Sequence, residues 1–403
     1  MLKRILNSLD LIKELTSQED ILIVQDIDGV CIPLVKDPMK RVIESKYVKA
    51  ISSFSNEFAV LTCGEHEGPR GVNRIIERSI GSIEAVRKEG LYLPGLAACG
   101  VEYQDRYGNI SLPGLEKGEI DFLNKIPHKM EELLIEELPS VMPWLTTSEI
   151  SKQANRAICD TRFSPAINLN ELFSLVPNKI EIQQNLQIMM EKVMNKVIFF
   201  AESKGLEGVF HLHISPNLGL KNGKEISKYA TKDDIGTTDI QLIINGALKE
   251  AGLLFLINQY IKQKTGESPL GKDFNVREAP RSASKLVEKV FENIPAKEMP
   301  TIVGVGDTVT SIMNPKNKAW LRGGSDRGFL TLIKELGKKF NKENRVIFVD
   351  SSHGEVYRPS TKGGSLNGIS DPDDLLKFDL VMEGGPMQYI EWIIKLSKIR
   401  NKF

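Results

Sequence analysis

The sequence predicts an α/β fold: a doubly wound, Rossmann-like parallel sheet core with an inserted α+β domain. Four short apolar runs each end in a polar residue, namely 21–24 before Asp26, 58–61 before Thr62, 301–305 before Asp307 and 346–349 before Asp350. Continuous apolar runs of this length suit strands that are buried on both faces. Helical patterns lie between these runs, and strands that alternate with helices indicate a doubly wound core.

The helices are indicated by apolar residues that recur three or four positions apart. Such residues line one side of a predicted helix between 247 and 261, and of another between 329 and 336. Near the N-terminus the same spacing joins Leu2, Ile5, Leu9, Ile12 and Leu15. Charged residues interrupt that stretch throughout, so it predicts an amphipathic helix and not a signal peptide.

The middle of the chain has a different character. Long charged helical stretches (HKMEELLIEEL and KIEIQQNLQIMMEKVMNKVIFFAESKG) are followed by VFHLHISPN, which favours a strand. We therefore expect residues 111–245 to form an inserted α+β cap domain, with residues 1–110 and 246–403 as the two parts of the core.

Composition narrows the class of protein. The 403 residues include 53 Lys plus Arg and 53 Asp plus Glu. A net charge of zero argues against binding to nucleic acid or to an anionic membrane surface, and the apolar runs are too short to span a membrane. The four cysteines, at 31, 63, 99 and 159, have no metal-binding spacing. This favours reduced thiols, used as small buried side chains, in a cytoplasmic protein.

The strand ends carry the candidate chemistry, because open α/β sheets bind ligands at the carboxyl ends of their strands. Transfer of a phosphoryl group from a monoester needs a nucleophile, a proton for the leaving oxygen and cations near the phosphoryl oxygens. Asp26 is placed to attack, and Asp28 to protonate the leaving alkoxide and later accept a proton from water. Taken alone, the two aspartates would more often mark a polar strand end followed by a turn.

Three further residues complete the predicted catalytic set. Thr62 would hydrogen-bond one phosphoryl oxygen, and Lys249, near a helix start, would neutralise another. Asp307 would bind Mg²⁺ together with Asp26 and the backbone carbonyl of Asp28, because a carboxylate and a phosphate repel without a cation between them.

These stretches resemble a known family. DIDGV, LTCG, GALKEAGLLFL and VGDT are similar to the four motifs of haloacid dehalogenase-superfamily phosphatases, and the insert resembles the cap of their sugar-phosphate phosphatase branch. The resemblance is closer still to the glucosylglycerol-phosphate phosphatase family. It extends over nearly the whole chain and includes LTCGEHEGPRG, EGLYLPGLAACGVEYQDRYG, GTTDIQLIINGALKEAG, GVGDTVTS and GGSDRGFL.

The resemblance implies Mg²⁺-dependent hydrolysis of a small phosphorylated glycoside, 2-O-glucosylglycerol 3-phosphate, in the synthesis of a compatible solute. Two alternatives remain open. One is a phosphatase for sucrose, trehalose or glucosylglycerate phosphate; the other is a non-catalytic sugar-phosphate-binding regulator of a synthase. Because the two enzymes would act in consecutive steps, we also expect a physical association with the glucosyltransferase that makes the substrate.

The sequence leaves the roles of several other site residues open. Relatives commonly carry a second acid four residues after the metal-binding Asp, where this chain has Ser311. The metal site could therefore be completed by Ser311, by water, or by a later acid such as Asp326, which could instead cap a helix. Substrate contacts are expected from Glu65, His66 and Arg70, and from His213 on a cap strand. A structural role for that histidine is the alternative.

Overall fold

The computed structural model describes residues 7–159 and 161–400. Its central sheet has eight strands in the order β16-β15-β12-β1-β2-β3-β4-β5. The pairs from β16 to β3 are parallel, and β4 and β5 are antiparallel. The strands are β1 (Ile21–Gln25), β2 (Phe58–Leu61), β3 (Gly95–Ala97), β4 (Glu102–Gln104), β5 (Ile110–Ser111), β12 (Thr301–Gly306), β15 (Arg345–Val349) and β16 (Leu380–Met382).

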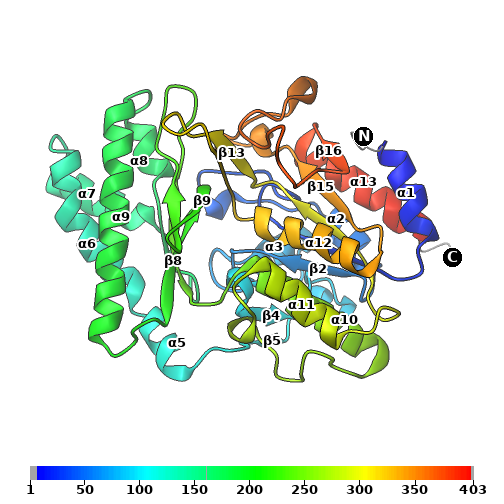
Figure 1. The fold of residues 1–403 in the computed structure, drawn as a ribbon. Helices are drawn as coiled ribbons and strands as arrows, with labels where there is room; N and C mark the ends of the chain where they lie inside the picture. The colour runs from blue at the N-terminus through cyan, green and yellow to red at the C-terminus, as the bar shows by residue number, and fades with distance from the viewer. Residues whose placement is uncertain (1–6, 160, 401–403) are drawn as a thin grey trace.

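Helices cover both faces of this sheet. The side chains of β1 alternate, so Ile21 and Ile23 enter one core cluster while Leu22 and Val24 enter the other. The first cluster lies under α1 (Ser8–Ser17), α2 (Ser45–Ser52), α3 (Val72–Ile80), α4 (Ile83–Glu89) and α13 (Gly385–Arg400). The second lies under α10 (Lys249–Thr265), α11 (Ala283–Asn293) and α12 (Arg327–Phe340), which run across the front of the core in Figure 1. The predicted doubly wound α/β core is confirmed.

The four predicted strands are β1, β2, β12 and β15, and they occupy the middle of the sheet. The sequence did not predict β3, β4, β5 and β16, which are only two or three residues long. The predicted N-terminal helix is α1, where Ile12 and Leu15 are buried. Leu2 and Ile5 lie outside the described residues.

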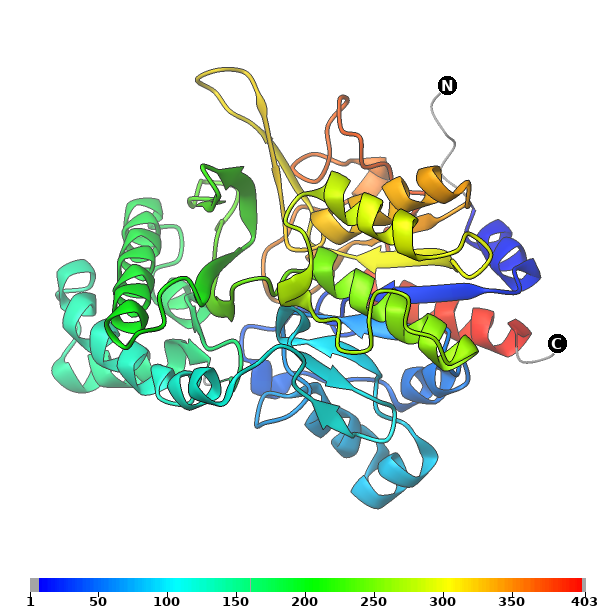
Figure 2. The ribbon, with the colours of Figure 1, turned by 60° about the horizontal axis from the view of Figure 1, so that its bottom comes forward.

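The cap is built on a second sheet with the order β6-β7-β11-β8, all antiparallel. Its strands are β6 (Ile158–Cys159), β7 (Ala166–Asn168), β8 (Phe210–Ser215) and β11 (Asp239–Ile244). The helices α5 (Lys117–Leu123), α6 (Ile126–Val141), α7 (Thr147–Ala157), α8 (Asn170–Leu175) and α9 (Ile180–Ser203) accompany it. Figures 1 and 2 show this group beside the core sheet. The boundaries at 110 and 245 stay a prediction; β5, which still pairs with the core sheet, ends at Ser111.

Two small ribbons lie near the junction of core and cap. β9 (Asn217–Lys221) pairs with β10 (Lys224–Ser227), and β13 (Thr310–Met313) pairs with β14 (Trp320–Gly323). Asn217 joins the two ribbons, because its backbone carbonyl accepts a hydrogen bond from the Thr310 hydroxyl. Within the ranges 7–159 and 161–400, no helix is both long and apolar enough to cross a membrane.

Candidate active site

A cleft of about 220 Å³ lies where the carboxyl ends of β1 and β2 meet the cap sheet. Its lining from the core includes Asp26, Asp28, Thr62, Glu65, Arg70 and Lys249, and from the cap Asn168, His213, Ser215, Asp239 and Gln241. Asp307 lies behind it, in a small adjoining cavity that shares Thr308 and Arg358 with the cleft. The structure thus brings all five predicted catalytic residues to one place.

Lys249 is the first residue of α10. The chain leaves the cap at the end of β11 and turns at Gly246, which has a φ of +109°. The Nζ atom of Lys249 lies 2.7 Å from Asp26 Oδ2 and 2.7 Å from Asp326 Oδ1. Burial raises the pKa of Asp26, the Lys249 ammonium opposes this, and the carboxylate of Asp326 adds to it. Lys249 therefore already neutralises the residue that is predicted to attack phosphorus.

Three carboxylates meet around this lysine. One oxygen from each of Asp26, Asp307 and Asp326 lies within 4.8 Å of the others, and all three residues are buried. Burial and the two neighbouring carboxylates raise the pKa of Asp307 well above its ordinary value. The Lys249 ammonium and, near Asp307, the Arg358 guanidinium face these three carboxylates, so one negative charge is in excess when all five groups are ionised. A buried cluster of this charge needs a cation to remain ionised.

The carboxylate oxygens of Asp307 are available to bind a cation. Both of its side-chain oxygens are buried, and neither has a partner at hydrogen-bonding distance among the described residues, although the Ser351 side chain is near enough to lower the pKa of Asp307. Space for the carboxylate is provided by Gly29, at a φ of +84°, where a Cβ atom would lie only 2.2 Å from Asp307 Oδ2. Carboxylate oxygens in this state fit a hard divalent cation such as Mg²⁺.

Asp326 and Ser311 are distinguished by the structure. Asp326 Oδ2 accepts the backbone N–H groups of Asp307 and Thr308, both at 2.9 Å, so it holds the loop that carries Asp307. The Ser311 hydroxyl instead donates to the carboxylate of Asp371, which also pairs with Arg322. Asp326, unlike Ser311, therefore belongs to the carboxylate cluster.

Asp28 and Thr62 line the cleft with different partners. Asp28 Oδ2 accepts a 2.8 Å hydrogen bond from Nη1 of Arg41, a residue that sequence reasoning missed. The Thr62 hydroxyl oxygen accepts the backbone N–H of Gly64 at 3.2 Å. Its proton remains available to a phosphoryl oxygen.

Glu65 and His66, both predicted to contact the substrate, have partners that the sequence did not predict. The Glu65 carboxylate accepts three backbone N–H groups of the cap, from Arg162 at 2.9 Å, Phe163 at 2.5 Å and Ser164 at 3.2 Å. It lines the cleft but is occupied in joining core to cap. His66 is fully buried outside the cleft, with Nε2 3.1 Å from the Gly95 carbonyl oxygen. From this position His66 does not contact a substrate in the cleft, contrary to the prediction.

Arg70 and His213 do reach the cleft. Arg70 Nη2 donates to the backbone carbonyl of Ile158 at 3.0 Å, so this arginine also spans core and cap. His213 Nδ1 lies 3.0 Å from Glu225 Oε1, while its buried Nε2 has no hydrogen-bond partner among the described residues. Burial would lower the pKa of His213, but the Glu225 carboxylate outweighs it and the pKa is raised.

The cap presents further polar side chains that sequence reasoning missed. Asp239 pairs with Ser215 and with Asn168, and Gln241 pairs with His213, so these five side chains share one face of the cap sheet. The buried Oδ1 of Asp239 has no hydrogen-bond partner in the described part of the chain, and burial raises the pKa of Asp239 to about 6. The signal in the sequence was the alternation of Asp239 and Gln241 with apolar residues, which predicts a two-faced strand.

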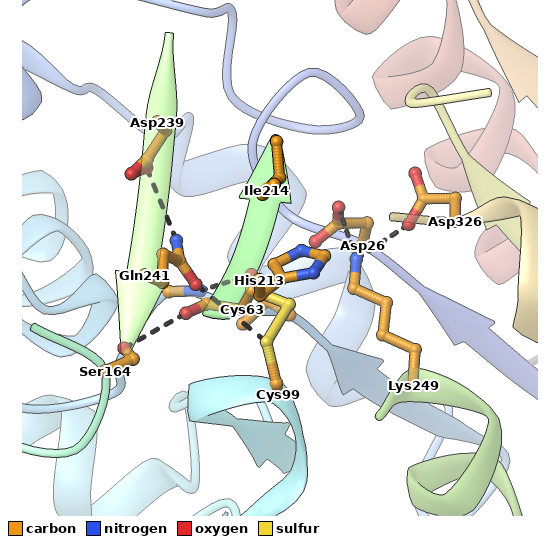
Figure 3. The surroundings of a disulfide bond; sticks show 12 residues. Asp26, Cys63, Cys99, Ser164, His213, Ile214, Asp239, Gln241, Lys249 and Asp326 are labelled. Carbon is orange, nitrogen blue, oxygen red and sulfur yellow. Dashed lines mark hydrogen bonds and ion pairs between the residues drawn. A yellow bond between two sulfur atoms is a disulfide. The ribbon is translucent and has the colours of Figure 1, made fainter. Parts of the chain in front are cut away.

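The structure contains a disulfide between Cys63 and Cys99 (Figure 3). The prediction of reduced thiols is therefore wrong for this pair, whereas Cys31 and Cys159 are not joined in a disulfide. Cys63 follows β2 and Cys99 follows β3, and these strands are parallel neighbours. Their ends thus meet, with the two Cα atoms 4.1 Å apart, although the cysteines are separated by 36 residues of sequence.

The sequence matches known proteins over most of its length. The family model described as glucosylglycerol-phosphate phosphatase matches residues 20–397. A curated glucosylglycerol-phosphate phosphatase from Synechocystis sp. is 41% identical over 388 residues, which cover 93% of this chain and 92% of that protein.

Solved structures give more distant matches. The trehalose-6-phosphate phosphatase of Aspergillus fumigatus has 9% identity and a TM-score of 0.41, with 98% of both chains covered. The C-terminal domain of the C. albicans trehalose-6-phosphate phosphatase has 12% identity and a TM-score of 0.46, with 98% and 99% covered. Because similarity at this level decides nothing about family, the assignment follows from the sequence matches. By these matches, which confirm the prediction of a phosphatase, the chain belongs to the glucosylglycerol-phosphate phosphatase family.

Proposed function

We propose that this enzyme is a Mg²⁺-dependent phosphatase that hydrolyses 2-O-glucosylglycerol 3-phosphate to glucosylglycerol and phosphate, in the cytoplasm, for compatible-solute synthesis. The observation that carries the proposal is the convergence of Asp26, Thr62 and Lys249 on one cleft, with Asp307 in the cavity behind it, in a member of this family. The name of the Synechocystis relative supports the choice of substrate.

In the first step, a carboxylate oxygen of Asp26 attacks phosphorus and the bond to the glycerol oxygen breaks. Lys249 and Thr62 donate to the phosphoryl oxygens, whose charge is shared in the transition state. Lys249 lies 2.7 Å from Asp26, so it aligns the attacking carboxylate while remaining close to the group under transfer.

Asp28 acts as the general acid and then as the general base. It gives a proton to the departing glycerol oxygen, then accepts one from the water that attacks the phosphorus bound to Asp26. Arg41 fixes the Asp28 carboxylate through its 2.8 Å contact, and its own Nε donates to the Pro38 carbonyl at 3.2 Å. The second step releases phosphate and restores Asp26.

A Mg²⁺ ion would be held by the carboxylates of Asp26 and Asp307 and by the Asp28 carbonyl. The fit is supported by the Asp307 oxygens, which no described residue reaches at hydrogen-bonding distance, and by the space that Gly29 leaves beside them. When bound, the ion supplies positive charge that lets an anionic carboxylate approach an anionic phosphate.

The glycoside would lie against the polar face of the cap sheet. Asp239, Gln241 and His213 offer acceptors and donors there. Two of these atoms, Asp239 Oδ1 and His213 Nε2, are buried and have no hydrogen-bond partner among the residues that the structure describes. Buried groups of this kind favour a ligand whose hydroxyls complete their hydrogen bonds, and disfavour analogues that lack them.

The test is a panel of phosphate esters ranked by kcat/KM with Mg²⁺ present: glucosylglycerol, sucrose, trehalose and glucosylglycerate phosphates, glycerol 3-phosphate, and p-nitrophenyl phosphate. We expect glucosylglycerol phosphate to rank first, and removal of Mg²⁺ by a chelator to abolish phosphate release. The control is Asp26→Asn, which should be inactive on every ester. Preference for sucrose phosphate would overturn the substrate, and full activity of Asp26→Asn would overturn the nucleophile.

The substrate must be supplied by glucosyl transfer onto a glycerol phosphate. We therefore also propose a physical association with the glucosyltransferase that performs this transfer. Co-elution of the two proteins at working concentrations is expected, and separate elution would contradict it.

A further inference from the structure

The Cys63–Cys99 disulfide lies next to a catalytic residue in the sequence. Cys63 is the residue after Thr62, and the backbone N–H of Cys99 donates to the Thr62 carbonyl at 3.0 Å. The neighbouring Ala98 N–H donates to the Gly64 carbonyl at 2.6 Å. The disulfide and these two hydrogen bonds therefore fix the same few residues that carry Thr62 and lead to Glu65.

The disulfide also faces the cap (Figure 3). A ring nitrogen of His213 and the two sulfur atoms lie within 4.8 Å of one another. Cys99 Sγ lies 3.9 Å from Gln241 Oε1, and the Ser164 hydroxyl donates to the Cys63 carbonyl at 3.3 Å. A disulfide sulfur carries no proton, so the contact with Gln241 becomes a hydrogen bond only when Cys99 is a thiol. The redox state of the pair thus changes a contact between core and cap.

The two sulfur atoms differ in access. Cys63 is half-buried and lines the cleft, whereas Cys99 is 1% exposed. A thiol entering the cleft can therefore reach the sulfur of Cys63, with Cys99 as the leaving group. In a cytoplasmic protein, a disulfide in such a position is more commonly redox-sensing than structural.

We propose that Cys63 and Cys99 form a redox-active pair that holds the Thr62 segment in its catalytic position when oxidised and releases it when reduced. The effect on catalysis rests on the proposed phosphatase function. The reductant is a dithiol. Its thiolate attacks Cys63 Sγ, the sulfur–sulfur bond breaks, and Cys99 leaves as a thiolate that takes up a proton. The second thiol attacks the mixed disulfide and releases Cys63, which is also protonated. The pair gains two electrons and two protons, and the dithiol becomes a disulfide.

The direction of the effect follows from the backbone. Ala98 and Cys99 have φ values of +48° and +54°, in the left-handed region that side chains other than glycine disfavour. Without the cross-link these residues can return to ordinary conformations, which removes the hydrogen bonds to Thr62 and Gly64. Because a shift of about 1 Å at a catalytic group can cost about 100-fold, we expect reduction to lower kcat by at least about threefold.

The experiment equilibrates the full-length enzyme in buffers of reduced and oxidised dithiothreitol. Thiols are counted by quenching, alkylation and mass spectrometry, while kcat is measured with Mg²⁺ and p-nitrophenyl phosphate. Backbone hydrogen exchange of residues 62–66 and 96–100 is followed in the same samples. We expect kcat to fall and exchange in both segments to rise as the pair is reduced.

Variants separate the pair from other thiols and from effects of dithiothreitol on the metal. Cys63→Ser and Cys99→Ser should lose the response to dithiothreitol, while Cys31→Ser and Cys159→Ser should keep it. A pair that stays reduced in oxidising buffer, or a kcat that is unchanged or rises on reduction, would overturn the inference. If the oxidised enzyme hydrolysed no ester, the proposed function would fail. Hydrogen exchange would then still decide whether the pair controls the Thr62 segment.

Discussion

Asp326 uses both of its carboxylate oxygens without any metal ion, and this makes its role testable at the level of one residue. Oδ1 pairs with Lys249, and Oδ2 accepts the backbone N–H groups of Asp307 and Thr308. It therefore orients both the lysine and the loop that would hold the ion. Residues that orient metal ligands in this way commonly change metal affinity by about 10- to 100-fold when they are replaced.

We expect Asp326→Asn to raise the Mg²⁺ concentration for half-maximal activity by about 10- to 100-fold, because an amide cannot serve Lys249 and the two backbone donors equally well. Ser311→Ala is the matched control, since the Ser311 hydroxyl is bonded to Asp371 outside the cluster. Calorimetric titration with Mg²⁺ gives the affinity independently of activity. An unchanged affinity in Asp326→Asn, or a larger loss in Ser311→Ala, would contradict the assignment.

The residues that could be predicted from sequence are those that follow a strand or begin a helix. This holds for four residues of the site: Asp26, Thr62, Lys249 and Asp307. Their order along the chain is what indicated a phosphatase site. Arg41 and Asp239 could not be found in this way, because nothing local distinguishes an arginine or aspartate that faces a cleft from one on the surface. Their roles depend on contacts between segments that only the folded chain brings together.

At the level of elements, Glu65 connects the segment after β2 to the cap segment between β6 and β7. The side chain is 4% exposed and accepts three backbone N–H groups. Its neighbour Glu67 reaches the same cap segment through an exposed ion pair, 3.2 Å from Arg162 Nη1. The two glutamates thus offer a matched comparison of buried and exposed contacts.

We expect Glu65→Ala to lower the free energy of unfolding by about 3 kcal/mol, because it leaves buried amide donors without partners. Glu67→Ala should cost less than about 1 kcal/mol, as exposed ion pairs generally do. Urea unfolding measures both, and limited proteolysis between β6 and β7 should be faster in Glu65→Ala alone. Equal losses in the two variants would show that burial of the carboxylate is not the cause.

The strands that could be predicted from the sequence were those with the longer runs of apolar residues. β1, β2 and β15 each have four consecutive apolar residues, and β12 has three within four positions. β3 and β16 have only three residues each and take their shape from pairing with neighbours. The Cys63–Cys99 bond depends on the same pairing, since it joins the ends of β2 and β3. Strand order could not be read from the sequence, and neither could the bond.

For the whole molecule, the stability in acid depends on histidines that are buried without charge. His66 is fully buried, its Nε2 lies 3.1 Å from the Gly95 carbonyl oxygen, and Gln104 Nε2 lies 3.3 Å from its Nδ1. The carbonyl accepts a hydrogen bond from Nε2 and the amide donates one to Nδ1, so the two partners suit the neutral ring with its proton on Nε2. Burial lowers the pKa of His66 from 6.5 to about 4.

The sign of the pH effect follows from these two values. The unfolded chain protonates this histidine below about pH 6.5 and the folded chain only below about pH 4, so protons favour unfolding between them. The stabilisation is complete above pH 6.5 and is lost as the pH falls toward 4. From pH 7 to pH 5, His66 alone should lower the free energy of unfolding by about 2 kcal/mol.

His66→Gln should remove this loss, because a glutamine amide can still donate to the Gly95 carbonyl but does not titrate. Urea unfolding at pH 7 and pH 5 should therefore show a decrease that is about 2 kcal/mol smaller in the variant than in the wild type. His128→Gln is the control, since His128 is exposed on α6, and it should show the wild-type decrease. If His66→Gln and the wild type lose the same free energy between the two pH values, His66 is not held neutral in the folded enzyme, and acid acts on its stability elsewhere.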